Sequence, residues 1–483
     1  MKIKKVAVAG ATGFVGTAII DSLLKKYEVR GLTRSEGKIS QATEDDPVEW
    51  TYCDVHSSDS VNLALEGVDC LIYLIHSMVP SSRLTQASFQ DLDVLIADQF
   101  AKSSSLNKVK QIIYISGLMP SEFEKSKTSK HLQSRYEVER ILESSDASLT
   151  TLRCGVIVGP GGSSLKILIN LVRRIVIMGL PTWTSSMTQP IAIHDVERAL
   201  KICLDDPKNY VGSFDIGGPD VMTYKEMMQS TAKTMKRKRF MFSVPIIPIS
   251  FSKRWVSTFS GVSIDLVGPL IDSLKHDLVV KKNRLQHLII DKSEQFEKSL
   301  ENSMDKKGFP INNPRQNYRI FDKKNIRKAK RVRSVQRLPL PEGKNARWVM
   351  EEYLQWLPKT LITILRCDVT DDKLVSFYLR VVPKPLLVLQ LDEHGTDQNL
   401  VLKIVGGILA NVGDSPNGRL EFREVLQGQS VMSAIHDFSP SLPWYLYNIT
   451  QAVAHLMVMK AFGHHLQKLC ENPPKLQQKL QTA

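Results

Sequence analysis

Residues 1–20 read MKIKKVAVAGATGFVGTAII, and the nature of this stretch decides the fold. A basic start followed by a run of small apolar residues is one form of secretory signal peptide. However, Gly10, Gly13 and Gly16 interrupt the run at a regular spacing of three. Each glycine costs about 1 kcal/mol inside a helix, so the uninterrupted helix of a signal peptide is the less favoured interpretation.

The residues on either side of the glycines indicate a strand and a helix. Residues 4–9 (KKVAVA) form a short apolar run that is typical of a buried parallel strand. Phe14, Val15, Ala18 and Ile19 then recur at helical spacing. In a strand–glycine turn–helix unit, the unpaired N–H groups at the helix N-terminus bind a phosphate group. The opening stretch therefore predicts a nucleotide-binding loop.

Strand and helix patterns alternate through the first third of the chain. Strands are predicted over residues 28–33, 48–53, 70–75, 111–115 and 150–158. Helices are predicted between them, over residues 59–66, 89–103 and 134–142. This alternation predicts an α/β fold, a doubly wound parallel Rossmann sheet with helices on both faces.

The length of 483 residues is sufficient for two or three domains. We expect the Rossmann domain in residues 1–300, with a small substrate subdomain in about 159–190 and 217–300. A polar and basic linker is expected over 301–335. A C-terminal domain is expected over 336–483.

The C-terminal domain has a different pattern. Strands are predicted over 374–382, 385–391, 400–407 and 420–425, followed by a long helix over 448–469. Antiparallel strands followed by one long helix indicate an α+β domain. The last 65 or so residues resemble a domain that is similar to helix-grip ligand-binding folds, which implies an apolar ligand cavity.

The net charge of +14 is concentrated in the basic run 323–337. No interleaved aromatic residues or nucleic-acid motif accompany the run, so we expect a solvated linker and no nucleic-acid partner. The apolar stretch 240–271, with Trp255 and Phe259, suggests either the wall of the substrate subdomain or peripheral contact with a membrane surface. The wall is the favoured interpretation.

The six cysteines are scattered and form no CxxC pair, so neither a zinc site nor a disulfide framework is expected. This usage fits a reducing cytoplasm. The spacing of His455, His464 and His465 on one helix, with His436 elsewhere and no acidic partner, gives no metal site. No apolar run reaches the roughly 18 residues that a spanning helix needs.

The residues after the second strand indicate the cofactor. NAD-specific sites usually place a carboxylate there, whereas an arginine accommodates the 2′-phosphate of NADP. Here Leu32 and Thr33 are followed by Arg34 and Ser35, with no acid. The sequence thus favours NADP(H) over NAD(H). Asp54, after the third strand, is expected on the adenine side.

A series of motifs now carries a family resemblance: GATGFVG, VRGLTR, CDV, LIYLIHSM, YISGL, LRCGVIVGPGGSS and DIGGPDVMTY occur in this order. The chain resembles the NmrA-like NAD(P)H-binding branch of the atypical short-chain dehydrogenase/reductase superfamily over about residues 1–300. Within that branch it is similar to bacterial epimerase-like proteins. The resemblance implies cofactor binding by Gly10, Thr12, Gly13, Phe14, Val15, Gly16, Arg34, Asp54, Val55, His76 and Ser77.

Active members of this superfamily use a Tyr-x-x-x-Lys pair on one helix, with a serine at the end of the fifth strand. Ser116 matches that serine. In the register that the superfamily's glutamate sets, His131 occupies the tyrosine position and Arg135 the lysine position. An arginine cannot act as a base, whereas a histidine with a near-neutral pKa can serve as an acid. Tyr136, with an arginine four residues later, is shifted by about 100° around the helix.

Three functions remain open. The first is a reductase for an apolar or quinone-like carbonyl, with Ser116 polarising the oxygen and His131 or water supplying the proton. The second is a non-catalytic NADP(H) sensor or assembly factor, which the loss of the Tyr-x-x-x-Lys pair favours. The third is a nucleotide-sugar epimerase, against which the same loss counts. His76 is a second candidate proton donor.

Overall fold

The computed structural model describes residues 2–43, 45–78, 82–121, 124, 128–244, 247–313, 316, 331–361, 364–393, 395–413 and 417–472. The chain divides into two compact units. Unit 1 contains residues 1–79 and 96–320, and unit 2 contains residues 80–95 and 321–483. Unit 2 therefore includes an early segment that the predicted division placed in residues 1–300. The reason is that β5 (Leu84–Gln86) pairs with β15 (Val332–Pro339) in the sheet of unit 2.

The core of unit 1 is a seven-stranded sheet in the order β12-β7-β6-β4-β1-β2-β3. Its strands are β1 (Lys5–Ala9), β2 (Glu28–Thr33), β3 (Val48–Tyr52), β4 (Cys70–Tyr73), β6 (Gln111–Gly117), β7 (Ser148–Cys154) and β12 (Gly212–Ile216). Every pairing between them is parallel. The predicted doubly wound Rossmann-like sheet is confirmed. Strand order reverses between β1 and β4, which is where such sheets bind their ligands.

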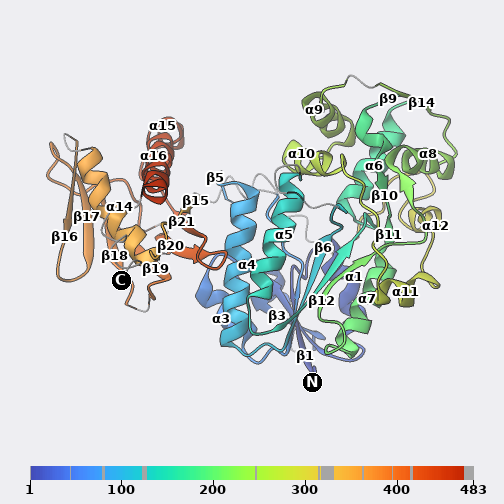
Figure 1. Cartoon of the computed structure of the whole chain (residues 1–483), viewed down its shortest axis with the longest axis horizontal. Coiled ribbons are helices and arrows are strands. Elements are labelled where there is room, and N and C mark those ends of the chain that lie inside the picture. The colour runs from blue at the N-terminus through green and yellow to red at the C-terminus, as the bar shows by residue number, and fades with distance from the viewer. Residues whose placement is uncertain are drawn as a thin grey trace, which may run out of the picture. The chain divides into compact units, whose positions relative to one another are not determined.

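Helices cover both faces of this sheet (Figure 1). One face carries α1 (Phe14–Leu23), α7 (Ile193–Asp205) and α11 (Arg284–Ile290). The other face carries α3 (Ser58–Leu65), α4 (Phe89–Leu106) and α5 (Lys130–Glu143). A short helix, α2 (Glu36–Ser40), follows β2. Because both faces are covered, strands such as β1 are continuously apolar, and Val6 to Ala9 are fully buried.

A smaller subdomain with its own apolar core lies beside the carboxyl ends of the strands. Its helices are α6 (Ser163–Arg174), α8 (Tyr224–Thr234), α9 (Ile249–Ser260), α10 (Ile264–Ser273) and α12 (Phe296–Glu301), with the 3-10 turn η1 (Thr182–Ser185). Its strands are β8 (Ile157–Val158), β9 (Ile177–Leu180), β10 (Met187–Thr188), β11 (Ile191–Ala192), β13 (Met222–Thr223) and β14 (Phe240–Ser243), joined in pairs. The core of the subdomain joins residues from α6, α8, α9 and α10.

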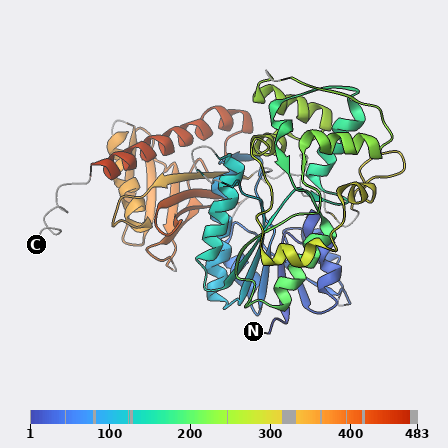
Figure 2. The same cartoon turned by 45° about the vertical axis from the view of Figure 1, so that its right-hand side comes forward.

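Unit 2 is built on an eight-stranded mixed sheet in the order β16-β17-β18-β19-β20-β21-β15-β5. Besides β5 and β15, its strands are β16 (Leu365–Val369), β17 (Leu374–Leu379), β18 (Leu387–Leu391), β19 (Asn399–Gly406), β20 (Arg419–Val425) and β21 (Ser430–Phe438). Its helices are α14 (Ala346–Thr360), α15 (Trp444–Ile449) and the long α16 (Gln451–Glu471), which runs along the sheet in Figure 2. Residues of α14 and α16 share one apolar core with the strands. The predicted α+β class is confirmed, and the helix-grip resemblance stays a prediction.

The structure corrects the prediction of a linker over the whole basic run 323–337. Residues 323–330 lie outside the described residues, but Arg331 is followed directly by β15, which begins at Val332. The arginines of VRSVQRLP hid a largely buried strand, in which Val332 and Leu338 enter the core. The strand is held between β21 and β5.

Within the described ranges, no helix has both the length and the apolar character that crossing a membrane requires. The same ranges contain no cluster of three or more His, Cys, Asp or Glu side chains arranged for a metal ion. All six cysteines are free.

The core of unit 2 yields a stability prediction. Phe462 on α16 is fully buried, and its ring centroid lies 5.1 Å from that of Tyr353. Phe462→Ala should lower the free energy of unfolding of this unit by about 3–5 kcal/mol through lost burial and a cavity. Met457→Ala on the same helix is the control, because that side chain is 66% exposed and should change stability little. Urea unfolding followed by circular dichroism measures both, and equal effects would contradict the assigned core.

Candidate functional site

The turn between β1 and α1 forms an anion cradle. Gly13 is the N-cap of α1 and supplies no capping side chain, and the first turn of the helix contains no acidic residue. The N–H groups of Phe14, Val15 and Gly16 therefore have no intrahelical acceptor. Together with the positive end of the helix dipole, they can bind a phosphate group.

Two glycines give this turn its shape. Gly10 has φ +97°, a backbone conformation that side-chain-bearing residues rarely adopt. A Cβ on Gly16 would overlap the carbonyl oxygen of Gly10 and the backbone of Ala11. The helix thus begins in direct contact with the end of β1, which leaves room for a pyrophosphate above it. These features fit a dinucleotide.

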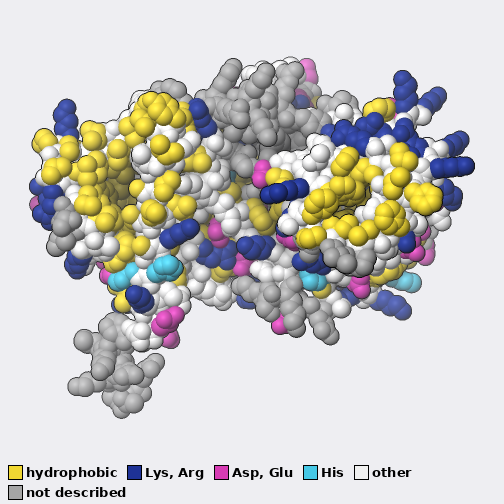
Figure 3. All heavy atoms as spheres, turned by 90° about the horizontal axis from the view of Figure 1, so that it is seen from above, with side chains coloured by type: hydrophobic (Ala, Val, Ile, Leu, Met, Phe, Trp, Pro, Cys, Tyr) yellow, Lys and Arg dark blue, Asp and Glu magenta, His cyan; other side chains and the backbone are white. Residues whose placement is uncertain are grey.

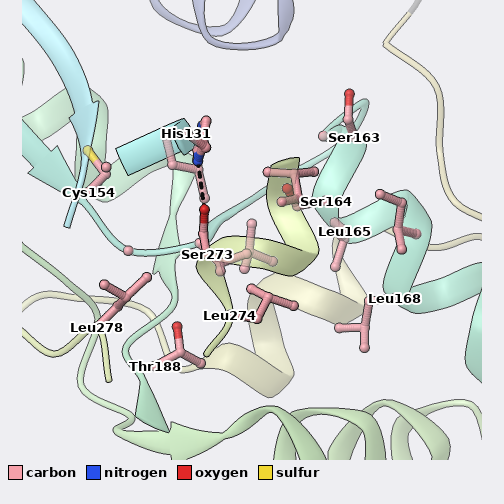
Figure 4. A pocket seen from close by; sticks show the side chains of 18 of the residues that line it. His131, Cys154, Ser163, Ser164, Leu165, Leu168, Thr188, Ser273, Leu274 and Leu278 are labelled. Carbon is pink, nitrogen blue, oxygen red and sulfur yellow. Dashed lines mark hydrogen bonds between the residues drawn. The ribbon is translucent and has the colours of Figure 1, made fainter. Parts of the chain in front are cut away.

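One cavity of about 420 Å³ in unit 1 extends from this turn into the subdomain. At its polar end lie Gly10, Gly13, Phe14, Val15, Gly16 and His76, together with Ser116, His131 and Arg135. At its other end the walls are apolar: they are formed by side chains of α6, α8, α9 and α10, including Leu165, Leu168, Met227, Met228, Val256, Val267 and Leu270. Figure 4 shows Leu165, Leu168 and Leu274 around this region.

Ser116 lies near the end of β6, and its side chain lines the cavity. Its hydroxyl is buried and has no hydrogen-bond partner among the described residues. A buried polar atom without a partner costs free energy, so it indicates a ligand or water at that position. The hydroxyl can donate a hydrogen bond to an oxygen of a bound molecule.

His131 and Arg135 lie one turn apart on α5, and both line the cavity. The alternative pair four residues apart, Tyr136 and Arg140, is not part of the lining, and Arg140 is exposed. The helix register inferred from the sequence therefore directs the first pair to the cavity. Arg135 is 6% exposed, so its positive charge lies in a largely desolvated position.

His131 is held by a residue from the subdomain. Its Nδ1 lies 3.1 Å from Oγ of Ser273 on α10 (Figure 4). Ser273 Oγ donates to the carbonyl oxygen of Pro269 at 3.0 Å, and Ser129 Oγ lies 2.9 Å away. A hydroxyl has one proton, and a carbonyl oxygen can only accept. With the Ser273 proton directed to Pro269, we assign Nδ1 of His131 as the donor to Ser273, and the lone pair then lies on Nε2.

The charge state of His131 differs from the near-neutral pKa expected from the sequence. Burial, with smaller contributions from the charges of Arg135 and His76, lowers the pKa of His131 from 6.5 to about 3. Removal from water and the positive charge of a nearby guanidinium both disfavour the protonated form of an imidazole. At neutral pH His131 is thus an uncharged hydrogen-bonding group and not a reservoir of protons.

The remaining predicted cofactor residues lie outside the cavity lining. Thr12 is in the glycine turn itself, and Ser77 follows His76 after β4. Arg34 follows β2, and Asp54 and Val55 follow β3, so all three lie at the carboxyl edge of the sheet. Arg34, Asp54 and Val55 are each half-buried. This is the edge along which the adenosine half of a dinucleotide would extend from the turn.

Ser273 is the residue that sequence reasoning missed. It lies 142 positions after His131, at the end of α10 and just beyond the apolar stretch 240–271 that was predicted as a wall. The sequence offers no pattern that links the two. Only the packing of α10 against α5 brings the serine to the histidine.

Comparisons with known proteins agree with this geometry. Residues 10–169 match the model of an NAD(P)H-binding family. The auxiliary protein GraX of Staphylococcus aureus is 29% identical over 113 residues, which are 23% of this chain and 36% of that protein. The match thus spans about a third of that relative's length. A UDP-glucose 4-epimerase of Vibrio cholerae is 23% identical over 269 residues, or 50% of this chain and 79% of that enzyme.

A solved structure shares the fold of the first unit. The crystal structure of a nucleoside-diphosphate-sugar epimerase from Staphylococcus aureus aligns with a TM-score of 0.50 and 14% identity. The alignment covers 62% of this chain and all of that chain. The glycine turn, the strand order and the family match agree: residues 10–169 are similar to an NAD(P)H-binding family, and the unit that contains them has a Rossmann-like fold.

Proposed function

We propose that this protein is an NADP(H)-dependent reductase of an apolar or quinone-like carbonyl compound. The observation that carries the proposal is the single cavity that joins the glycine turn to an apolar wall. Its volume of about 420 Å³ lies within the range of small-molecule sites. An apolar wall favours a substrate of low polarity, because such a ligand is removed from water there without unpaired polar groups.

The chain's own residues fit the cofactor. The N–H groups of α1 would hold the pyrophosphate, and Arg34 would pair with a 2′-phosphate. Bound NADPH would supply a hydride to the substrate carbon. Ser116 would then donate a hydrogen bond to the substrate oxygen as negative charge develops on it.

The proton that completes the reduction must come from a group that carries one. His131 is uncharged at neutral pH, and its Nδ1–H is used by Ser273. We therefore assign the proton to water, and the hydroxide that remains takes a proton from bulk solvent. His131 has a positioning role, in which Nε2 accepts a hydrogen bond from that water. This refines the expectation that His131 or water is the donor.

A second candidate is a non-catalytic NADP(H) sensor or assembly factor. It is favoured by one observation, which is that a neutral His131 and a permanently charged Arg135 stand where the superfamily has its proton-exchanging pair. A third, epimerase-like candidate fits the cavity less well, since a nucleotide sugar is polar and the wall of the subdomain is apolar.

The reductase proposal predicts the effect of Ser116→Ala. In a screen of apolar ketones and quinones followed by NADPH absorbance, the wild type should turn over at least one class. Loss of one hydrogen bond to the developing charge should lower kcat about 10²–10³-fold, with NADPH affinity unchanged. Ser121→Ala, an exposed serine after the same strand, is the control. Tight NADPH binding without turnover of any compound would favour the sensor instead.

Cofactor choice is tested at Arg34. Titration of the purified protein should give a dissociation constant for NADPH at least tenfold below that for NADH, about 1.4 kcal/mol. Arg34→Ala should weaken NADPH binding by a similar factor and leave NADH binding nearly unchanged, because only NADPH carries the 2′-phosphate. Arg140→Ala, which is exposed and remote from the cavity lining, should change neither constant. Equal affinities in the wild type would remove the assigned role of Arg34.

The state of His131 can be measured directly by nitrogen NMR of histidine-labelled protein. The imidazole should remain the neutral Nδ1–H tautomer as the pH falls through 6.5, and should protonate only near pH 3 if the fold persists. In Ser273→Ala the Nδ1–H loses its acceptor, so the Nε2–H tautomer should appear at neutral pH. Titration of His131 near 6.5 in the wild type would instead restore it as an acid.

A further inference from the structure

Helix α9 has an exposed aromatic face. Phe251, Trp255 and Phe259 recur every four residues and therefore share one side of the helix. Phe251 is 58% exposed and Phe259 is 38% exposed. An adjacent side of the helix, about 100° around from the middle of this face, supplies Val256 to the cavity and to the core of the subdomain. The aromatic residues that the sequence suggested for a wall are thus partly turned to solvent.

The two-stranded sheet of β9 and β14 is also exposed on one side. Phe240 pairs with Ile177, and they are 77% and 67% exposed. Phe242, two residues along β14, is 49% exposed. The alternate residues Met178 and Leu180 enter the core. Successive side chains of a strand point to opposite faces of the sheet, so one face of this pair of strands is exposed.

Cationic residues border this apolar surface. The run Lys236-Arg237-Lys238-Arg239 precedes Phe240 directly. Arg237 and Arg239 donate to backbone carbonyls at the end of α6, beside Arg173 and Arg174. Burial and the neighbouring charges of Arg174 and Arg237 lower the pKa of Arg173, which indicates a locally positive field.

Few carboxylates offset this charge. Asp305 is the acid that acts on Arg173, and Asp272 pairs with Lys253 of α9 at 2.8 Å. Asp265 is exposed on α10. Among the described residues, no carboxylate forms an ion pair with the four residues 236–239. Figure 3 shows this part of unit 1 at its right: hydrophobic side chains surround a hollow, and Lys and Arg side chains border them.

We propose that this surface, formed by Ile177, Phe240, Phe242, Phe251 and Phe259 with the basic run 236–239, docks on an anionic lipid bilayer. Aromatic and aliphatic side chains enter the boundary between headgroups and acyl chains, while lysines and arginines lie against anionic headgroups. A nucleic-acid duplex would pair with the cations, but its bases are stacked within the helix, so it would leave Ile177 and the exposed phenylalanines without an apolar partner. The combination of exposed apolar side chains with cationic residues therefore favours an anionic lipid surface. The inference does not depend on the proposed reaction.

The test is sedimentation of the full chain with vesicles of two compositions. Vesicles of phosphatidylglycerol and phosphatidylcholine should bind the protein, and vesicles of phosphatidylcholine alone should bind it at least about tenfold more weakly. Each lysine near an anionic surface contributes about fivefold in affinity. The double variant Lys236→Glu/Lys238→Glu should thus lower binding to the anionic vesicles more than about twentyfold. Phe240→Ser/Phe251→Ser should lower it about tenfold or more, because apolar insertion is lost.

Matched controls carry the same changes on other exposed elements of unit 1. Lys208→Glu/Lys282→Glu repeats the charge change, and Val211→Ser/Leu288→Ser repeats the apolar change at residues 50% and 54% exposed. Circular dichroism melting establishes that each variant is folded. Both controls should bind the anionic vesicles like the wild type.

Several results would overturn the proposal. Equal binding to both vesicle types, or binding that the surface variants leave unchanged, would exclude this surface as the docking site. The surface would be assigned to nucleic acid if the protein bound duplex DNA more tightly than vesicles and if only Lys236→Glu/Lys238→Glu weakened that binding. The surface would be assigned to a second copy of this chain if the wild type did not bind vesicles but formed a dimer in ultracentrifugation, and if Phe240→Ser/Phe251→Ser abolished that dimer.

Discussion

The contact between the start of α1 and the end of β1 is the constraint on which the site depends. Gly16 lies against the carbonyl of Gly10, and a side chain at position 16 would overlap that carbonyl oxygen. This contact fixes the direction in which the N-terminus of α1 points, and therefore where a phosphate group binds. Because β1 is in the middle of the sheet, between β4 and β2, the same point is where the strand order reverses. One tight turn thus places the N-terminus of α1 at the point where the strand order reverses.

The chemistry of the site depends on a second contact, which comes from the subdomain. Without Ser273, His131 would have either tautomer available and more contact with water. Packing of α10 against α5 fixes the proton on Nδ1 and helps to desolvate the ring. A histidine that the sequence suggests as an acid becomes, in its folded surroundings, a neutral acceptor. The subdomain therefore shapes the reactivity of the Rossmann part as well as the size of the cavity.

Sequence patterns were most reliable where the structure is locally determined. Six strands of the seven-stranded sheet, β1, β2, β3, β4, β6 and β7, begin within two residues of their predicted positions, because buried parallel strands are continuous apolar runs. The cavity-facing pair on α5 followed from the register of the superfamily's motif on that helix. In unit 2, by contrast, β15 was hidden by its arginines and α14 was not predicted, since both are polar on one side and depend on distant partners. The pairing of β5 with β15 joins residues about 250 positions apart, and no local pattern encodes it.

The sequence by itself determined the class of the first unit, the glycine turn and the position of Arg34, Asp54 and Val55 along the carboxyl edge of the sheet. These follow from local backbone preference and from the periodicity of apolar residues, which act over a few positions. Only the tertiary structure decided the extent of the cavity, the partner and charge of His131, and which aromatic residues of α9 and β14 remain exposed. Burial, pKa and exposure depend on what packs against a side chain, and those neighbours come from segments far apart in the chain.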